Sequence, residues 1–171
     1  MDRRDFMKEM AVGGTGALIP WVPRGMERAQ PPVATPEYKF FTTEEATTMI
    51  AICEQIVPRD EYPGAKESGV VDYIDGVLSG RMGRFYKSNY RRGLVVLEDV
   101  CQKRHGKNFS ALSWNDQSAI LRDFETGTAS GASGKKFFSL LVAHTMEGYY
   151  GDPSHGGNRG GASWNMINFN G

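Results

Sequence analysis

The chain has 171 residues, 40% of them hydrophobic, and its equal numbers of acidic and basic side chains give a formal net charge of zero. This balance lacks the excess of basic residues that nucleic-acid-binding proteins use, so we expect no nucleic acid among its partners. Its only two cysteines, Cys53 and Cys101, form no Cys-x-x-Cys motif, which excludes the common zinc and redox patterns.

Residues 1–30 have the features of an export signal. A basic start precedes a weakly apolar, glycine-containing run that is too short to span a bilayer. The letters RRDFMK match the twin-arginine motif, in which Arg3 and Arg4 are the arginine pair and Phe6 and Lys8 occupy the aromatic and lysine positions. We therefore expect a folded protein exported to the periplasm by the twin-arginine translocase. Because no good cleavage site follows, two alternatives stay open: the signal is removed, or it is kept as a membrane anchor.

Residues 31–41 are rich in proline, and we expect an extended linker there. Thr42 and Glu45 then form a capping-box pattern at the start of a helix that Pro58 ends. The apolar spacing and the glycines that follow predict further helices. The five expected helices cover residues 42–57, 70–78, about 83–104, 113–124 and 135–149.

The last of these helices is apolar on almost all sides, which predicts burial in the chain's own core or against another chain. No segment alternates cleanly between apolar and polar residues, as a strand would. The sequence therefore predicts an all-α fold with a single helical domain over residues 42–171.

Residues 149–171 combine many glycines with aromatic residues and have no helical period. Flexible linkers rarely hold so many aromatic residues, so we expect an irregular tail that packs on something. Two alternatives are a surface loop and a partner-binding segment, and the aromatic residues favour the second. The expected interface residues are Tyr149, Tyr150, Gly151, Asp152, Pro153, Gly156, Gly157, Asn158, Arg159 and Trp164.

Other candidate sites are weaker. Glu147, Asp152 and His155, with His144 nearby, could be imagined as metal ligands, but a hydrogen-bonded core position is favoured for His144 and a turn for Asp152. We therefore predict no catalytic, cofactor or metal residues on this chain. In the stretch Ile-Val-Pro-Arg-Asp, a structural turn at Arg59 and Asp60 is favoured over a direct partner contact.

The two cysteines lie on helix faces that should turn inward. Three alternatives stay open for Cys53 and Cys101: a disulfide within the chain, two buried free thiols, or a bridge to a partner chain. An oxidising compartment favours the first.

Several stretches together make the chain resemble the gluconate 2-dehydrogenase subunit 3 family over its whole length. The most specific are EQIVPRDEYPGAKESGVVDYIDGVL at Glu54–Leu78 and GYYGDPSHGGNR at Gly148–Arg159, supported by RRDF at the start and CQKRHGKNFSALS at Cys101–Ser113. One departure is Ser163 before Trp164, where the family has glycine.

The resemblance implies a non-catalytic small subunit without a cofactor of its own. It would bind a larger FAD-dependent subunit of the glucose-methanol-choline type that oxidises a sugar, sugar acid or glycoside, and would carry that subunit through the translocase. A cytochrome c subunit often completes such complexes, which would place the chain in the periplasm, or at the membrane through the complex. The alternative is a self-contained periplasmic enzyme or metal-binding protein.

Overall fold

The computed structural model describes residues 37–169, and these belong to one compact unit that spans residues 36–171. The predicted export motif, Arg3, Arg4, Phe6 and Lys8, lies outside the described residues, as does most of the predicted linker. The described region is all-α, as predicted, and contains no strand. Its α-helices are α2 (Thr43–Ile56), α3 (Val70–Ser79), α4 (Lys87–His105), α5 (Trp114–Thr126), α6 (Gly131–Tyr150) and α7 (Ala162–Met166). Four short 3₁₀ segments join them: η1 (Arg81–Phe85), η2 (Phe109–Ala111), η3 (Pro153–His155) and η4 (Arg159–Gly161).

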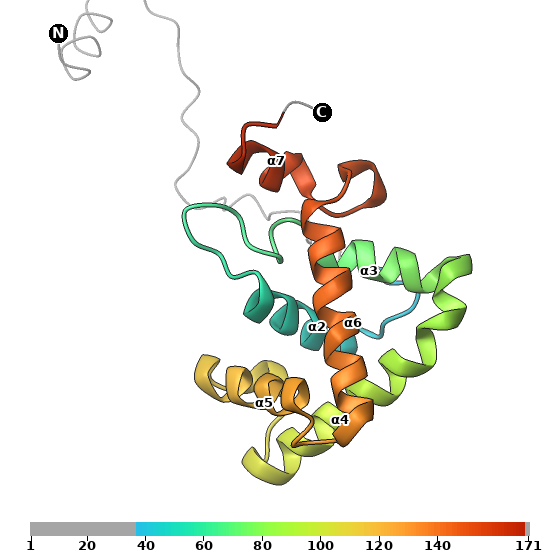
Figure 1. The fold of residues 1–171 in the computed structure, drawn as a ribbon, viewed down its shortest axis with the longest axis vertical. Coiled ribbons are helices and arrows are strands. Elements are labelled where there is room, and N and C mark those ends of the chain that lie inside the picture. Colours follow the sequence, from blue (N-terminus) through green and yellow to red (C-terminus); the bar gives the residue numbers. More distant parts are fainter. Residues whose placement is uncertain (1–36, 170–171) are drawn as a thin grey trace, which may run out of the picture. The chain divides into compact units, whose positions relative to one another are not determined.

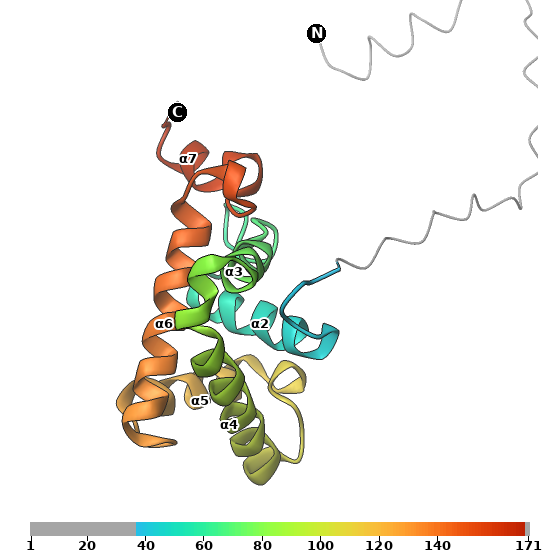
Figure 2. The same ribbon diagram turned by 90° about the vertical axis from the view of Figure 1, so that its right-hand side faces the viewer.

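The long helix α6 organises this unit. It contacts each of the other five α-helices of the described region. Its N-terminal half lies beside α4 and α5, and its C-terminal half runs past α3 towards α7 (Figures 1 and 2). The side chains that the helices bury between them form the core, in which the largest fully buried ones include Met49, Ile52, Tyr90, Phe109, Phe124 and Phe137. Burial of one such side chain stabilises the fold by about 1.5–3 kcal/mol.

Local sequence features set several helix ends as predicted. At the start of α2, the Thr42 hydroxyl accepts from the Glu45 N–H and the Glu45 carboxylate accepts from the Thr42 N–H, which confirms the capping box. Ser113 caps α5 in a similar way, through a bond from the Asp116 N–H. Gly106, with φ of 65°, ends α4 in the left-handed conformation that favours glycine.

One predicted helix boundary is wrong. A single helix from about Gly83 was expected, but residues 81–85 form η1 and α4 begins only at Lys87. The chain's own core buries only one side of α6, so the alternative of burial against another chain stays a prediction for the other side. The inner face of α6 holds Phe137, Leu141 and His144, whereas Ala143 and Met146 are exposed.

The predicted linker becomes part of the fold before α2. The backbone N–H groups of Lys39, Phe40 and Phe41 donate to the carboxylate of Asp75 on α3, at 2.8, 2.9 and 3.1 Å. Phe41 itself is buried in the core. The extended linker that we expected over residues 31–41 therefore does not include Lys39, Phe40 and Phe41.

Candidate functional site

The C-terminal segment, where we predicted a partner interface, is more regular than its glycines suggested. α6 continues through Tyr150, and η3, η4 and the short helix α7 follow it. The expectation of an irregular tail is wrong for these stretches. The reason lies in where the glycines stand: Gly156 and Gly161, with φ of 98° and 65°, are at the ends of the short helical segments.

Several of the predicted interface residues contact their own chain. Tyr149 is buried, and its hydroxyl donates to the carbonyl of Pro63 at 2.8 Å. Asn158 is fully buried; its amide donates to the Gly151 carbonyl at 2.9 Å, and its amide oxygen accepts from the Ser163 N–H at 3.0 Å. These side chains hold the segment in shape, and they are not available at the surface.

The same segment is tied to the residues around the start of α3. The Arg159 N–H donates to the Ser68 carbonyl at 3.0 Å, and the Arg159 guanidinium forms an ion pair with Asp72. Gly157 is buried against α6, where an added Cβ would lie only 2.1 Å from the Gly148 carbonyl oxygen. A larger residue does not fit at that position.

Asp152 forms a turn, as we favoured from the sequence. Its carboxylate accepts from the Ser154 N–H at 2.8 Å, and Pro153 begins η3 directly after it. The hydrogen bonds from Ser154 hold the pKa of Asp152 below its ordinary value. The carboxylate is therefore charged and serves as the cap of η3.

Among the residues that the segment leaves at the surface are three large apolar side chains. Tyr150 is 44% exposed, Ile167 62% and Phe169 52%. Trp164 is half-buried: its indole N–H donates to the Tyr150 carbonyl at 3.2 Å, and its ring meets Phe169 edge-on at 5.2 Å. We call Tyr150, Trp164, Ile167 and Phe169 the C-terminal patch. Ile167 and Phe169 lie in the predicted partner-binding tail but were not among the individual interface residues, because no local pattern told which side of the segment faces solvent.

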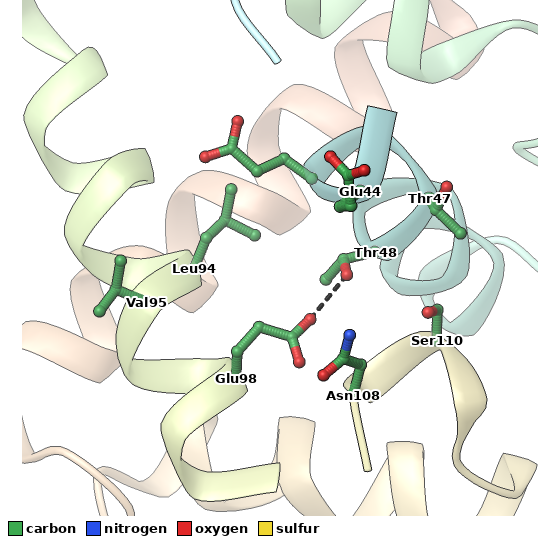
Figure 3. Close-up of a pocket in the computed structure, with 9 residues that line it drawn as sticks. Glu44, Thr47, Thr48, Leu94, Val95, Glu98, Asn108 and Ser110 are labelled. Carbon is green, nitrogen blue, oxygen red and sulfur yellow. Dashed lines mark hydrogen bonds between the residues drawn. The ribbon is translucent and has the colours of Figure 1, made fainter. Parts of the chain in front are cut away.

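A separate groove of about 440 Å³ lies between α2, α4 and the segment around η2 (Figure 3). The groove is lined by two apolar side chains of α4, three glutamates and several uncharged polar residues. The lining residues are Glu44, Glu45, Thr47, Thr48, Leu94, Val95, Glu98, Asn108 and Ser110. Both carboxylate oxygens of Glu98 bind its own chain. They accept from the Thr48 hydroxyl at 2.7 Å and from the Phe109 N–H at 2.9 Å. Glu98 therefore holds helices together.

The imagined metal ligands do not come together. Within residues 37–169, no group of three or more His, Cys, Asp or Glu side chains could hold a metal ion. His144 is a buried core residue whose Nδ1 lies 2.9 Å from the Tyr90 hydroxyl, and Glu147 accepts from the Tyr73 hydroxyl at 3.1 Å. Burial lowers the pKa of His144, which favours the neutral imidazole.

The Ile-Val-Pro-Arg-Asp stretch forms a turn after α2. The Asp60 carboxylate accepts from the Tyr62 N–H at 2.8 Å, and Arg59 forms an exposed ion pair with Glu67 at 3.4 Å. The Glu54 carboxylate, on α2 before this stretch, accepts from the N–H of Lys66, which lies beyond it, at 2.7 Å. These bonds agree with the structural interpretation of the stretch.

A family model described as gluconate 2-dehydrogenase subunit 3 matches residues 43–171, which is most of the chain. The chain belongs to the gluconate 2-dehydrogenase subunit 3 family. No curated protein and no solved structure matches it. The family is named for one subunit of gluconate 2-dehydrogenase, which fits an accessory role for this chain.

Both cysteines of this subunit 3 protein are buried free thiols, the second of the three alternatives open from the sequence. Cys53 lies 3.4 Å from the Thr145 hydroxyl, between α2 and α6. Burial raises the pKa of each thiol to about 12, so neither is a reactive thiolate at neutral pH. The predicted disulfide is absent from the described residues, because each cysteine packs into the core as a small apolar side chain.

Among residues 37–169, no helix has the length and apolar character that crossing a membrane requires. The matched region of the family model begins at Thr43, so it covers the helical unit and the C-terminal patch alike.

Proposed function

We propose that this chain binds, stabilises and co-exports a larger FAD-dependent dehydrogenase subunit of the glucose-methanol-choline type. The observation that carries the proposal is its membership of the gluconate 2-dehydrogenase subunit 3 family. In this proposal the flavin chemistry belongs entirely to the partner, which would oxidise a sugar, sugar acid or glycoside. The small subunit supplies a docking surface and an export signal, and a cytochrome c subunit is a further candidate member of the complex.

The N-terminal motif supports the export role in this proposal. Arg3, Arg4, Phe6 and Lys8 match the twin-arginine pattern at the start of the chain. That route carries folded proteins, so a complex can be assembled, with its flavin in place, before it leaves the cytoplasm. A partner without a signal of its own would then reach the periplasm with this chain.

The C-terminal patch supports the binding role. Its exposed residues, Tyr150, Ile167 and Phe169, are large apolar side chains of the kind that anchor protein interfaces. The bonds that hold the segment in place pre-organise it, which lowers the ordering cost of binding. Of the predicted interface residues, Tyr150, Asp152, Gly156 and Arg159 remain exposed and available for contact.

Co-purification tests the proposal. The full chain, tagged, is co-expressed with an FAD-dependent dehydrogenase subunit of the glucose-methanol-choline type from the same organism. We expect a yellow complex with the flavin absorbance of the partner and equal amounts of both chains. Separate elution of a colourless small chain and an active flavoprotein would contradict the proposal.

A further inference from the structure

A second groove, distinct from the one in Figure 3, opens between α3, η1 and α6. Its volume is about 470 Å³. Residues from all three elements and from Tyr86 line it, among them Tyr73, Gly76, Val77, Tyr86, His144 and Glu147. α3 and the C-terminal half of α6 lie side by side at this place (Figures 1 and 2).

The rim of this groove is apolar and exposed. Met82 of η1 lines the groove and is 57% exposed, and Phe85, on the same short segment but outside the lining, is 55% exposed. Side chains of this size on one short segment form a surface that water solvates poorly, and such surfaces mark interaction sites.

The rim also carries positive charge. Arg81 lines the groove, and Arg84 lies with its guanidinium 4.6 Å from the centre of the Phe85 ring. Neither arginine forms an ion pair with any side chain in residues 37–169. The exposed guanidinium groups of Arg81, in the groove lining, and of Arg84, on the same short segment, fit carboxylates on a binding partner.

The wall formed by α6 adds a polar group. The His144 side chain is only 4% exposed, yet it lines the groove, and its Nε2 has no hydrogen-bond partner among the described residues. When the Tyr90 hydroxyl donates to Nδ1, Nε2 carries the ring proton and is a hydrogen-bond donor. Beside it, the Glu147 carboxylate is already engaged by Tyr73.

We propose that this groove is a second docking site for the flavoprotein subunit, occupied by an apolar side chain of that subunit whose flanking carboxylates pair with Arg81 and Arg84. This inference rests on the proposed function, because it names the catalytic chain as the occupant. The groove and the C-terminal patch would then bind the same partner at two places along a single helix. That helix is α6, which supplies His144 and Glu147 to the groove and Tyr150 to the patch.

Gly76 offers a direct way to fill the groove. It lies on the exposed side of α3, and an added Cβ would meet no heavy atom within 4 Å. Gly76 also lines the groove, so Gly76→Phe adds a ring to the groove wall at a position with room for a Cβ. Glycine is also a poor helix former, so the change should not lower the melting temperature. The matched control is Ala119→Phe, which adds the same ring at an exposed position on α5.

The experiment measures the affinity of each full-length variant for the purified flavoprotein subunit, together with its melting temperature. We expect Gly76→Phe to weaken binding by about thirtyfold or more, the effect of losing one central anchor, with Ala119→Phe unchanged. The double variant Arg81→Glu, Arg84→Glu should slow association and reduce its dependence on salt.

Three results would overturn the inference while leaving the proposed function intact. The first is wild-type binding that Gly76→Phe leaves unchanged. The second is an association rate that the arginine reversals leave unchanged. The third is a wild-type chain that forms a dimer by itself while the Gly76→Phe variant is a monomer. The occupant of the groove would then be a second copy of this chain. Failure of the wild-type chain to bind the flavoprotein would instead defeat the proposed function itself.

Discussion

The carboxylate of Asp75 is only 5% exposed, and it accepts three backbone hydrogen bonds that fix the entry of the chain into α2. In Asp75→Asn, one oxygen is replaced by an NH₂ group that faces a backbone N–H, so two donors meet. We expect the free energy of unfolding to fall by about 1–3 kcal/mol, measured by urea denaturation. Asp99→Asn is the control, because Asp99 forms an exposed pair with Lys103, and its effect should stay within about 0.5 kcal/mol. Equal effects of the two changes would contradict this role of Asp75.

The buried thiols predict a dependence of stability on alkaline pH. Cys53 and Cys101 have pKa values raised from 9.0 to about 12 in the folded protein because burial disfavours the thiolate. Below pH 9 both states keep the thiols protonated, and the stabilisation is fully present. As pH rises from 9 towards 12 the unfolded chain loses these protons first, so stability falls by about 1.4 kcal/mol per thiol per pH unit.

Urea denaturation between pH 8 and 11 measures this fall, and the double variant Cys53→Ala, Cys101→Ala supplies the comparison. The variant should lose stability less steeply, because only the other groups still titrate. Alkylation of the unfolded, unreduced wild-type protein should also label both cysteines. Identical slopes, or a recovered peptide that links Cys53 to Cys101, would show that the thiols are not free and buried.

At the scale of helices, the capping residues made much of the fold predictable. Thr42 with Glu45, Ser113 and Gly106 act within a few residues of their own position, so their patterns are visible in the sequence. The break before α4 was not predicted. At Gly83 an added Cβ would lie 1.8 Å from the Leu78 carbonyl oxygen, so η1 folds back closely on the end of α3, and the apolar spacing of the sequence does not reveal this close approach.

The structure of the C-terminal segment, where we predict the partner interface, was not predictable in detail from the sequence. The aromatic and glycine content marked the C-terminal segment, yet its fold depends on partners far away in sequence, such as Pro63 for Tyr149 and Ser68 for Arg159. No local period encodes such contacts. The groove beside α3 was missed for the same reason, because three separate elements contribute its walls.

The C-terminal patch gives a prediction for a whole segment. Ile167 is 62% exposed, so Ile167→Asp should leave the melting temperature unchanged and weaken binding of the flavoprotein by about thirtyfold, because a charge enters an apolar contact. Val95→Asp is the control, since Val95 is 69% exposed on α4, outside the patch. Trp164→Ala should instead lower stability, because the indole bonds to Tyr150 and packs on Phe169. Unchanged affinity of Ile167→Asp would remove the patch from the interface.

At the scale of the whole molecule, the chain combines a helical unit of the gluconate 2-dehydrogenase subunit 3 family with the sequence Arg-Arg-Asp-Phe-Met-Lys near its start, which we propose is a twin-arginine motif. In the proposed function these two regions have different tasks: the helical unit holds the flavoprotein, and the motif directs the complex to the translocase. The tasks can be separated by variants, because Arg3 and Arg4 are far in sequence from the helices that would bind the partner.

The most direct test of the central claim measures where the partner's dehydrogenase activity is found. The full chain and the flavoprotein are co-expressed, and flavin-dependent activity is assayed in the periplasmic and cytoplasmic fractions. With the wild-type chain we expect activity in the periplasm. With Arg3→Lys, Arg4→Lys, which keeps the charge but removes the arginine pair, we expect an intact, active complex that stays in the cytoplasm. Periplasmic activity that does not depend on this chain or on its arginine pair would contradict the proposed export role.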